Sequence, residues 1–323
     1  ASITVMGVMA LKPMLQYGYS KRLTTGVIAA SGCLGILIPP SIMLILMASN
    51  SSLSVGELFA GSMGPGIILG LLYAGYVALV AIIRPDLAPP VPTDDKVSRG
   101  TLLRMLVMEA LPPLVLIFGI LGTMLAGIAT ATEASAIGAA LALGIVIFRG
   151  RFEWATFRSA VYETARTSAM ILFIVVGATA FTGVFNITGG LRAAQELMRS
   201  LDMAPWMLIA VMMFIVFALG MFLDWTGIVL LSFPIFLPIV QEMGVSELWF
   251  VVLTAVVLQT SFLSPPFGYA LFYLRALAPP EVRTSDIIIG VLPFIGLILM
   301  MAIAIAVFPE LVTWLPETLY QTK

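Results

Sequence analysis

Seven long stretches of this sequence contain no charged residue, and the shortest of them has 21 residues. A helix that crosses a bilayer needs about 20 mostly apolar residues, so each stretch is long enough to span a membrane. Only 10% of the 323 residues are charged, whereas about a quarter are charged in a typical soluble domain. We therefore expect an all-α integral membrane protein with about eight spans or half-spans. The stretches are Leu23–Gly56, Leu58–Ile83, Ala110–Thr132, Thr167–Leu191, Met203–Leu223, Leu248–Leu274 and Ile287–Pro309, and Ala134–Phe148 makes a further span when joined to its flank.

The composition also limits the chemistry open to the chain. It has no histidine and a single cysteine, Cys33. This excludes disulfide frameworks, Cys/His zinc sites, His-ligated haem and His-dependent catalytic triads. The formal net charge of −1 gives no bulk attraction to nucleic acid. We therefore expect no cofactor and no nucleic-acid partner, and the lipid bilayer as the environment.

Lysine and arginine residues indicate the orientation, because they are enriched on the cytoplasmic side of membrane proteins. The four basic clusters lie at 21–22, 84–104, 149–166 and 275–283. Three apolar stretches lie between Arg199 and Arg275: Met203–Leu223, Trp225–Gln241 and Leu248–Leu274. The basic clusters can share the cytoplasmic side, with Lys323 outside, only if the first two of these stretches turn back without crossing. We expect these two to form a re-entrant hairpin that turns at Gly220–Gly227, where Asp224 and two glycines interrupt the apolar sequence.

The sequence divides into four parts. Residues 1–83 form a first, partial repeat, and 84–104 form a cytoplasmic linker rich in proline and charge. Residues 105–202 are expected to contain further spans of a scaffold, with an amphipathic interfacial helix at Arg149–Arg166. Residues 203–323 form a second repeat.

Two proline pairs mark the repeats. Pro39-Pro40 and Pro265-Pro266 each lie inside an apolar span, 26 residues after Pro13 and 27 residues after Pro238. A proline pair removes two backbone donors and disfavours helix at the residue before it, so both helices must break. By the charge argument the two broken helices enter from opposite sides, which makes the repeats inverted. Inverted repeats with broken helices at matching positions indicate a secondary transporter.

Five ordered motifs are distributed over essentially the whole chain: GYSKRLTTGVIAASGCLGILIPPSIMLIL, SVGELFAGSMGPG, TATEASAIGAA, GMFLDWTGIVLLSFPIFLPIV and LQTSFLSPPFGYALFYL. They resemble the large membrane subunit of tripartite ATP-independent periplasmic (TRAP) transporters. The resemblance implies an inverted-repeat elevator transporter of the ion-transporter superfamily, with re-entrant hairpins and broken helices. It also implies coupling to a sodium gradient, a periplasmic substrate-binding protein, a small four-helix membrane subunit and the bacterial inner membrane.

The resemblance also implies an organic acid as substrate. The sequences around both proline pairs look most like the subgroup associated with mannitol and chloroaromatic compounds, and we expect a monocarboxylate such as a 2-oxo or 2-hydroxy acid.

Comparison of the two halves places the tip of the first hairpin at or just before Ala1. The N-terminal part of such a subunit is therefore expected to be missing from this chain.

The candidate ligand residues flank the two breaks and the hairpin turn, where backbone carbonyls, hydroxyls and helix ends meet. The expected sodium-binding residues are Gly32, Gly35, Asp224, Thr226, Thr260, Ser261 and Ser264, and the expected substrate-binding residues are Ser31, Ser41 and Gln259.

Most of these residues also have a purely structural interpretation, which the sequence leaves open. Asp224 can cap the helix that follows it. Serine and threonine hydroxyls in membrane helices often bond to their own helical turn, and glycines allow close helix packing. For Glu133 we prefer a structural hydrogen bond to a ligand role.

Other functions are less consistent with the sequence. A stand-alone sodium/anion symporter of the same superfamily, without a binding protein, is the main alternative. A membrane enzyme is disfavoured, because no span contains a DDxxD-type cluster, an HExxH motif or a GxGD motif. A non-transporting scaffold would leave the paired broken helices without a purpose.

Overall fold

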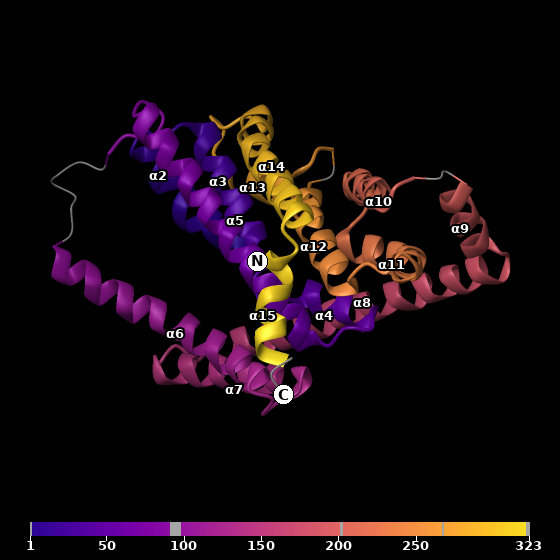
Figure 1. The fold of residues 1–323 in the computed structure, drawn as a ribbon. Helices are drawn as coiled ribbons and strands as arrows, with labels where there is room; N and C mark the ends of the chain where they lie inside the picture. Colours follow the sequence, from indigo (N-terminus) through magenta and orange to yellow (C-terminus); the bar gives the residue numbers. More distant parts are fainter. Residues whose placement is uncertain (1, 91–97, 201–202, 267, 321–323) are drawn as a thin grey trace. The chain divides into compact units, whose positions relative to one another are not determined.

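The computed structural model describes residues 2–90, 98–200, 203–266 and 268–320, and every regular element in these ranges is a helix (Figure 1). Lys323 and residues 91–97 of the predicted linker lie outside the described residues. The chain divides into two compact units. The first contains residues 1–90 and 181–323, and the second contains residues 91–180.

The second unit contains α6 (Arg99–Leu125), α7 (Ala131–Phe148) and most of α8 (Trp154–Ile187). The helices α6 and α7 form an antiparallel pair, because Arg149 at the end of α7 forms an ion pair of 3.3 Å with Glu109 early in α6. The start of α6 at Arg99 falls inside the predicted linker, so the helix begins before the linker's expected end.

The predicted interfacial helix at Arg149–Arg166 is wrong as a separate element. The structure continues from Trp154 to Ile187 as a single helix, α8, which is one candidate membrane span. The sequence contains no glycine or proline between Trp154 and the apolar run that begins at Thr167, so nothing interrupts the helix.

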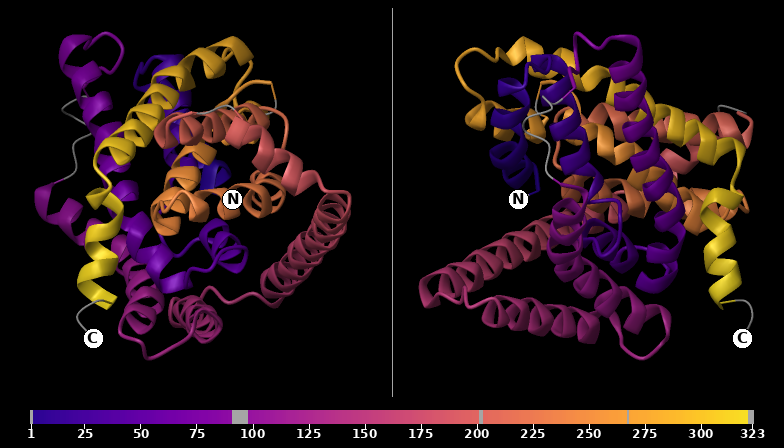
Figure 2. Two further views of the ribbon diagram at one scale, coloured as in Figure 1. Left: turned by 45° about the vertical axis from the view of Figure 1, so that its right-hand side comes forward. Right: turned by 90° about the vertical axis from the view of Figure 1, so that its left-hand side faces the viewer.

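The first unit contains the remaining helices, and its chain ends with α15, which follows a bend after α14 (Figure 2). Within the described residues, α5, α6, α7, α8, α11 and α14 are long and apolar enough to cross a membrane. The elements of the first unit are α1 (Ser2–Met6), the π-helix η1 (Gly7–Leu11), α2 (Lys12–Gln16), α3 (Lys21–Leu34), α4 (Ile42–Ser49), α5 (Val55–Ile83), α9 (Gly190–Ser200), α10 (Pro205–Gly220), α11 (Trp225–Glu242), α12 (Glu247–Leu263), α13 (Tyr269–Leu277), α14 (Thr284–Val307) and α15 (Glu310–Tyr320).

Both predicted helix breaks are present. The first separates α3 from α4 around Pro39-Pro40, and the second separates α12 from α13 around Pro265-Pro266. Both proline pairs are joined by cis peptide bonds. The predicted hairpin is present as α10 and α11, joined by the short turn Met221–Asp224.

The helix α12 is the core of the first unit. Every residue from Trp249 to Ser264 is buried, and α12 contacts α3, α5, α10, α11, α13, α14 and α15. A helix that is apolar all round is stable only when it is enclosed on all sides, which is the environment that these neighbours provide.

The contacts of α14 fix the relative directions of the two broken helices. Arg22 at the start of α3 forms an ion pair with Asp286 at the start of α14, so α3 and α14 begin at the same end. Trp249 at the start of α12 donates its indole N–H to the carbonyl of Ile305 near the end of α14, at 2.8 Å. The helix α12 therefore runs opposite to α14 and to α3, and the repeats are inverted, as predicted.

Matching contacts tie the two repeats together, and we call them the paired clasps. Lys21, the first residue of α3, donates from Nζ to the carbonyl of Glu281 at 2.7 Å. Glu247, the first residue of α12, accepts from the backbone N–H of Ser52 at 2.8 Å and from the Ser52 hydroxyl. Glu281 and Ser52 occupy equivalent places: Ser52 lies two residues before the N-cap of α5, and Glu281 lies two residues before the N-cap of α14. Each broken helix is thus held by the other repeat.

Candidate functional site

Four candidate residues lie together at the end of α12, beside the second break. Gln259, Thr260, Ser261 and Ser264 are exposed by only 1%, 0%, 5% and 2%. They are among the few polar side chains that the core of the first unit encloses. Their position next to a proline pair places hydroxyl and amide groups where the backbone also lacks helical partners.

Two backbone carbonyls at this break lack their helical hydrogen-bond donor. The carbonyls of Ser261 and Phe262 would accept from residues 265 and 266 in a continuous helix, and both of those residues are prolines without an N–H. The Thr260 carbonyl is engaged, because it accepts from the N–H of Ser264 at 2.8 Å. The helix ends at Leu263, two residues before Pro265, and its last turn satisfies Thr260 internally.

The Thr260 hydroxyl is also engaged, since it donates to the carbonyl of Val257 at 2.6 Å. In contrast, both amide atoms of Gln259 and the hydroxyls of Ser261 and Ser264 have no hydrogen-bond partner among the described residues. A buried polar group without a partner costs about 1–3 kcal/mol. Several such groups clustered at one break indicate a site that a polar ligand completes.

The end of α10, directly before the hairpin turn, lies against this break. A side chain at Gly220, the last residue of α10, would clash with the hydroxyl and Cβ of Ser261. The backbone of α10 therefore passes close to Ser261 of α12. Glycine is required here because any larger residue would force α10 away from α12.

The two candidate residues of the hairpin lie at the start of α11. Asp224 is half-buried and caps α11 by accepting from the N–H of Thr226 at 3.2 Å, so its predicted capping role is confirmed. Thr226 is buried. The carboxylate therefore belongs to the N-cap of α11 and the hydroxyl to its first turn, four and six residues after Gly220.

The glycines at the first break have different surroundings. A side chain at Gly32 would clash with Ile3 of α1, so this glycine allows α1 and α3 to pack closely, as its structural interpretation predicted. Among the described residues, only the Ser2 hydroxyl lies within 4 Å of a Cβ placed at Gly35, at 3.9 Å. Gly35 therefore has more room around it than Gly32.

The serines at the first break bond to local backbone. Ser31 donates to the carbonyl of Val27 at 2.6 Å. The Ser41 hydroxyl donates to the carbonyl of Ile36 and accepts from the N–H of Leu44, which caps α4. Each hydroxyl proton is thus used within the chain, and only the oxygen lone pairs are left for a ligand.

The two breaks therefore differ in chemistry although they correspond in the repeat. The positions that match Gln259, Thr260, Ser261 and Ser264 in the first break are Cys33, Leu34, Gly35 and Ile38, when the proline pairs are superimposed. The second break carries the polar side chains, and the first carries mainly backbone and small residues.

Sequence reasoning did not single out two polar residues of the first unit. Glu247 joins the repeats through Ser52 and also accepts from the Gln241 amide at 3.0 Å. The signal was its place directly after a serine at the start of the broken helix, which matches Lys21. Thr24 has a buried hydroxyl without a partner among the described residues, and no sequence motif marks it.

Glu133 acts structurally. It forms a capping box with Thr130 at the start of α7, where it accepts from the Thr130 N–H at 2.8 Å and its own N–H bonds the Thr130 hydroxyl. The preference for a structural role is therefore confirmed.

The apolar helices, the inverted broken helices and the polar break define the class as an all-α, multi-pass membrane transporter. The chain belongs to the family described as the DctM component of tripartite ATP-independent periplasmic transporters, whose family model matches residues 1–311. This confirms the resemblance and the bacterial inner membrane as the location. The family is a transporter permease, so a membrane enzyme is excluded.

Curated relatives agree with this assignment. The C4-dicarboxylate TRAP transporter large permease protein DctM of Pseudomonas aeruginosa is 28% identical over 320 residues, covering 99% of this chain and 73% of the relative. The protein of the same name from Rhodobacter capsulatus is 29% identical over 339 residues, covering 99% and 74%. The ectoine/5-hydroxyectoine TRAP transporter large permease protein UehC of Ruegeria pomeroyi is 30% identical over 331 residues, covering 98% and 72%.

Proposed function

We propose that the chain is the membrane permease subunit of a sodium-coupled, binding-protein-dependent importer of small organic acids. The observation that carries this proposal is the cluster of buried polar atoms without partners at the second break, on Gln259, Ser261 and Ser264. Membership of a tripartite periplasmic transporter family supports a periplasmic substrate-binding protein and a small four-helix membrane subunit as partners.

In this proposal the second break and the hairpin turn hold one sodium ion. The available oxygens are the carbonyls of Ser261 and Phe262 and the hydroxyls of Ser261 and Ser264, with Asp224 adding negative potential. Oxygen ligands without a soft donor suit a hard cation. Thr226 and Thr260 contribute through their second lone pairs, and the backbone at Gly32 and Gly35 forms part of a site at the first break.

The substrate anion is proposed to bind between the breaks, near Gln259, Ser31 and Ser41. No charged side chain is buried among the described residues of the first unit, so the carboxylate would be recognised by amides, hydroxyls and helix ends. The helix α13 supports this idea, because no side chain caps its N-terminus. The names of the relatives favour a small organic solute, and a monocarboxylate remains our expectation.

We further propose an elevator mechanism and keep the four-part division. The repeats at 1–83 and 203–323 would form the moving transport domain, whereas 105–202 would contribute to the scaffold. The linker at 84–104 would lie in the cytoplasm. The occurrence of both breaks and the hairpin in one compact unit supports this division.

Uptake by reconstituted proteoliposomes tests the proposal. The chain, a small membrane subunit and a cognate binding protein should import a labelled organic acid when a sodium gradient is imposed, and no ATP should be needed because the sequence has no P-loop. Uptake driven by a proton gradient in sodium-free buffer would contradict the coupling. Full uptake without the binding protein would instead favour the stand-alone symporter.

A further inference from the structure

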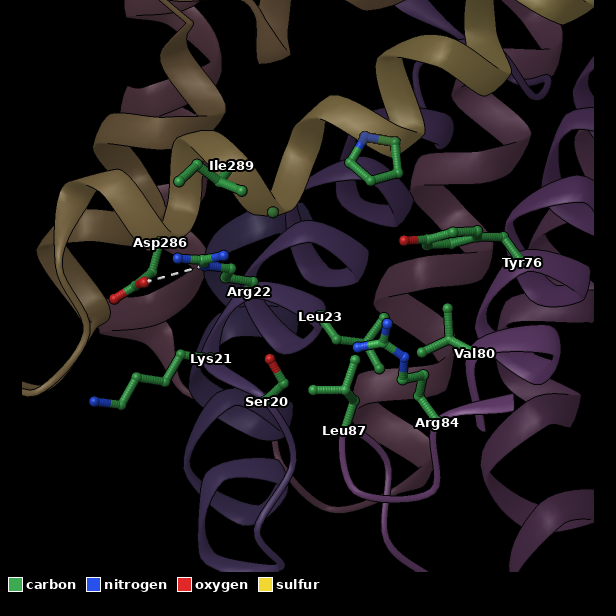
Figure 3. A pocket seen from close by; sticks show the side chains of 12 residues that line it. Ser20, Lys21, Arg22, Leu23, Tyr76, Val80, Arg84, Leu87, Asp286 and Ile289 are labelled. Atoms are coloured by element: carbon green, nitrogen blue, oxygen red, sulfur yellow. Dashed lines mark ion pairs between the residues drawn. The ribbon is translucent and has the colours of Figure 1, made fainter. Parts of the chain in front are cut away.

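A cavity of about 500 Å³ lies at one end of the first unit, away from both breaks (Figure 3). It is formed where α3 begins, α5 ends and α14 begins. We call it the α3–α5–α14 cavity. None of the candidate sodium or substrate residues lines it, so it needs a separate explanation.

The lining changes from charged to apolar along the helices. On α5, Arg84 follows the last residue, while Val80 and Tyr76 lie one and two turns inside the helix. On α14, Asp286 lies in the first turn and Pro293 two turns further in. The eight steps from Tyr76 to Arg84 span about 12 Å along the helix axis. The cavity therefore extends from the charged end of α5, a candidate membrane span, about two turns into its apolar part.

The charged end is positive. Lys21, Arg22 and Arg84 line it against one carboxylate, Asp286. The Arg22 Nε lies 3.6 Å from Asp286, which neutralises one cation. The Lys21 side chain is directed away from the others, toward the carbonyl of Glu281 (Figure 3). Within the described part of the chain, the Arg84 side chain makes no ion pair and no hydrogen bond, and it is exposed.

The start of α3 adds backbone donors to this end. Ser20 is the N-cap of α3, and its side chain makes no capping hydrogen bond. Ser246, the N-cap of the equivalent helix α12, accepts from the N–H of Trp249 at 3.3 Å. The first-turn N–H groups of α3, on residues that line the cavity, thus lack the cap that the other repeat has. Uncapped helix N-termini favour anions, and phosphate in particular.

We propose that the α3–α5–α14 cavity binds an anionic phospholipid. Its phosphate would lie between the Arg84 guanidinium and the start of α3, because a planar guanidinium can donate two parallel hydrogen bonds to phosphate oxygens. An acyl chain would follow Val80 and Tyr76 along α5. This apolar depth favours a lipid over a free anion, and the basic residues belong to the side that we expect to face the cytoplasm, where basic pockets between helices bind anionic headgroups.

Native mass spectrometry of the purified full chain tests this proposal. The delipidated protein is incubated with dioleoyl phosphatidylglycerol, with dioleoyl phosphatidylcholine or with glycerol 3-phosphate. We expect the phosphatidylglycerol adduct to form at about tenfold lower lipid concentration than the phosphatidylcholine adduct, and glycerol 3-phosphate not to compete. Arg84→Gln should remove this tenfold preference, since it deletes a charged hydrogen bond. Arg84→Lys keeps the charge but loses the paired donors, so it should retain part of the preference.

Arg151→Gln is the matched control, because it removes an exposed arginine on the same expected side of the membrane without touching the cavity. An equal loss of preference in Arg84→Gln and Arg151→Gln would show a general charge effect and overturn the proposal. Equal binding of the two lipids would also overturn it. If glycerol 3-phosphate, at the same concentration as phosphatidylglycerol, reduces the phosphatidylglycerol adduct, the cavity binds a free phosphate anion instead of a lipid.

Discussion

The strongest test of the proposed sodium site is Ser261→Ala. This substitution should not destabilise the sodium-free protein, but it should weaken the binding of sodium. The Ser261 hydroxyl is buried and has no partner among the described residues. Without an ion, its removal abolishes an uncompensated desolvation of about 1–3 kcal/mol. The free energy of unfolding in sodium-free buffer should therefore stay the same or rise by up to that amount.

With sodium bound, the same hydroxyl would be a ligand. Loss of a hydrogen-bond-like contact to a charged group is worth about 1.5–3 kcal/mol, which corresponds to roughly a 10- to 100-fold increase in the sodium concentration for half-maximal uptake. The assay is uptake in proteoliposomes over a sodium titration, together with thermal denaturation in the presence and absence of sodium. The stabilisation that sodium gives the wild type should shrink in the variant.

Ser232→Ala is the matched control. Ser232 is also a buried serine of the first unit, but its hydroxyl donates to the carbonyl of Ile228 in its own helix, at 2.6 Å. This variant should leave the sodium dependence unchanged. If Ser261→Ala is expressed normally and shows the sodium dependence of the wild type, the hydroxyl is not a ligand and the site lies elsewhere.

Three further predictions concern packing, the paired clasps and orientation. Gly220→Ala should lower the free energy of unfolding by about 1–3 kcal/mol through overpacking against Ser261, whereas Gly227→Ala, with open space around it, should not. Thermal denaturation distinguishes the two variants. Equal melting temperatures would show that α10 and α12 are not tightly packed at Gly220. Glu247→Gln should reduce stability by about 1 kcal/mol, because a neutral amide replaces the carboxylate that accepts from Ser52; an unchanged denaturation midpoint would mean that this clasp adds nothing. A single cysteine at position 151, in a Cys33→Ser background, should react with thiol reagents only from the cytoplasmic side, and labelling from the periplasm would reverse the proposed orientation.

Local features of the fold were predictable from the sequence, because each depends on a few neighbouring residues. The proline pairs dictated both breaks through missing N–H groups, and Asp224 marked the start of α11 as a cap. The charge asymmetry predicted that the repeats are inverted, which the contacts of α14 with Arg22 and Trp249 confirm.

Features that depend on how helices distant in sequence align with one another were not predictable. The contact of Gly220 with Ser261 requires one particular axial position of α10 relative to α12, which no local sequence pattern specifies. The predicted interfacial helix is wrong because charged residues alone do not end a helix, and no glycine or proline lies between Trp154 and the apolar run at Thr167. The hydrogen bond from the Ser264 N–H to the Thr260 carbonyl was also not predictable, because the proline pair does not determine how the last turn of α12 ends.

The paired clasps have a consequence for how the protein is made. Lys21 and the carbonyl that it binds are 260 residues apart in the chain. At synthesis rates of 5–20 residues per second, the second partner emerges from the ribosome roughly 10–50 s after the first. During that interval α3 lies in the bilayer with its basic end and the side of Gly26, which packs against Gly290, uncovered by α14. The early repeat must therefore be shielded by the insertion machinery or by lipid until the late repeat arrives, and the first unit closes only after translation has passed α14.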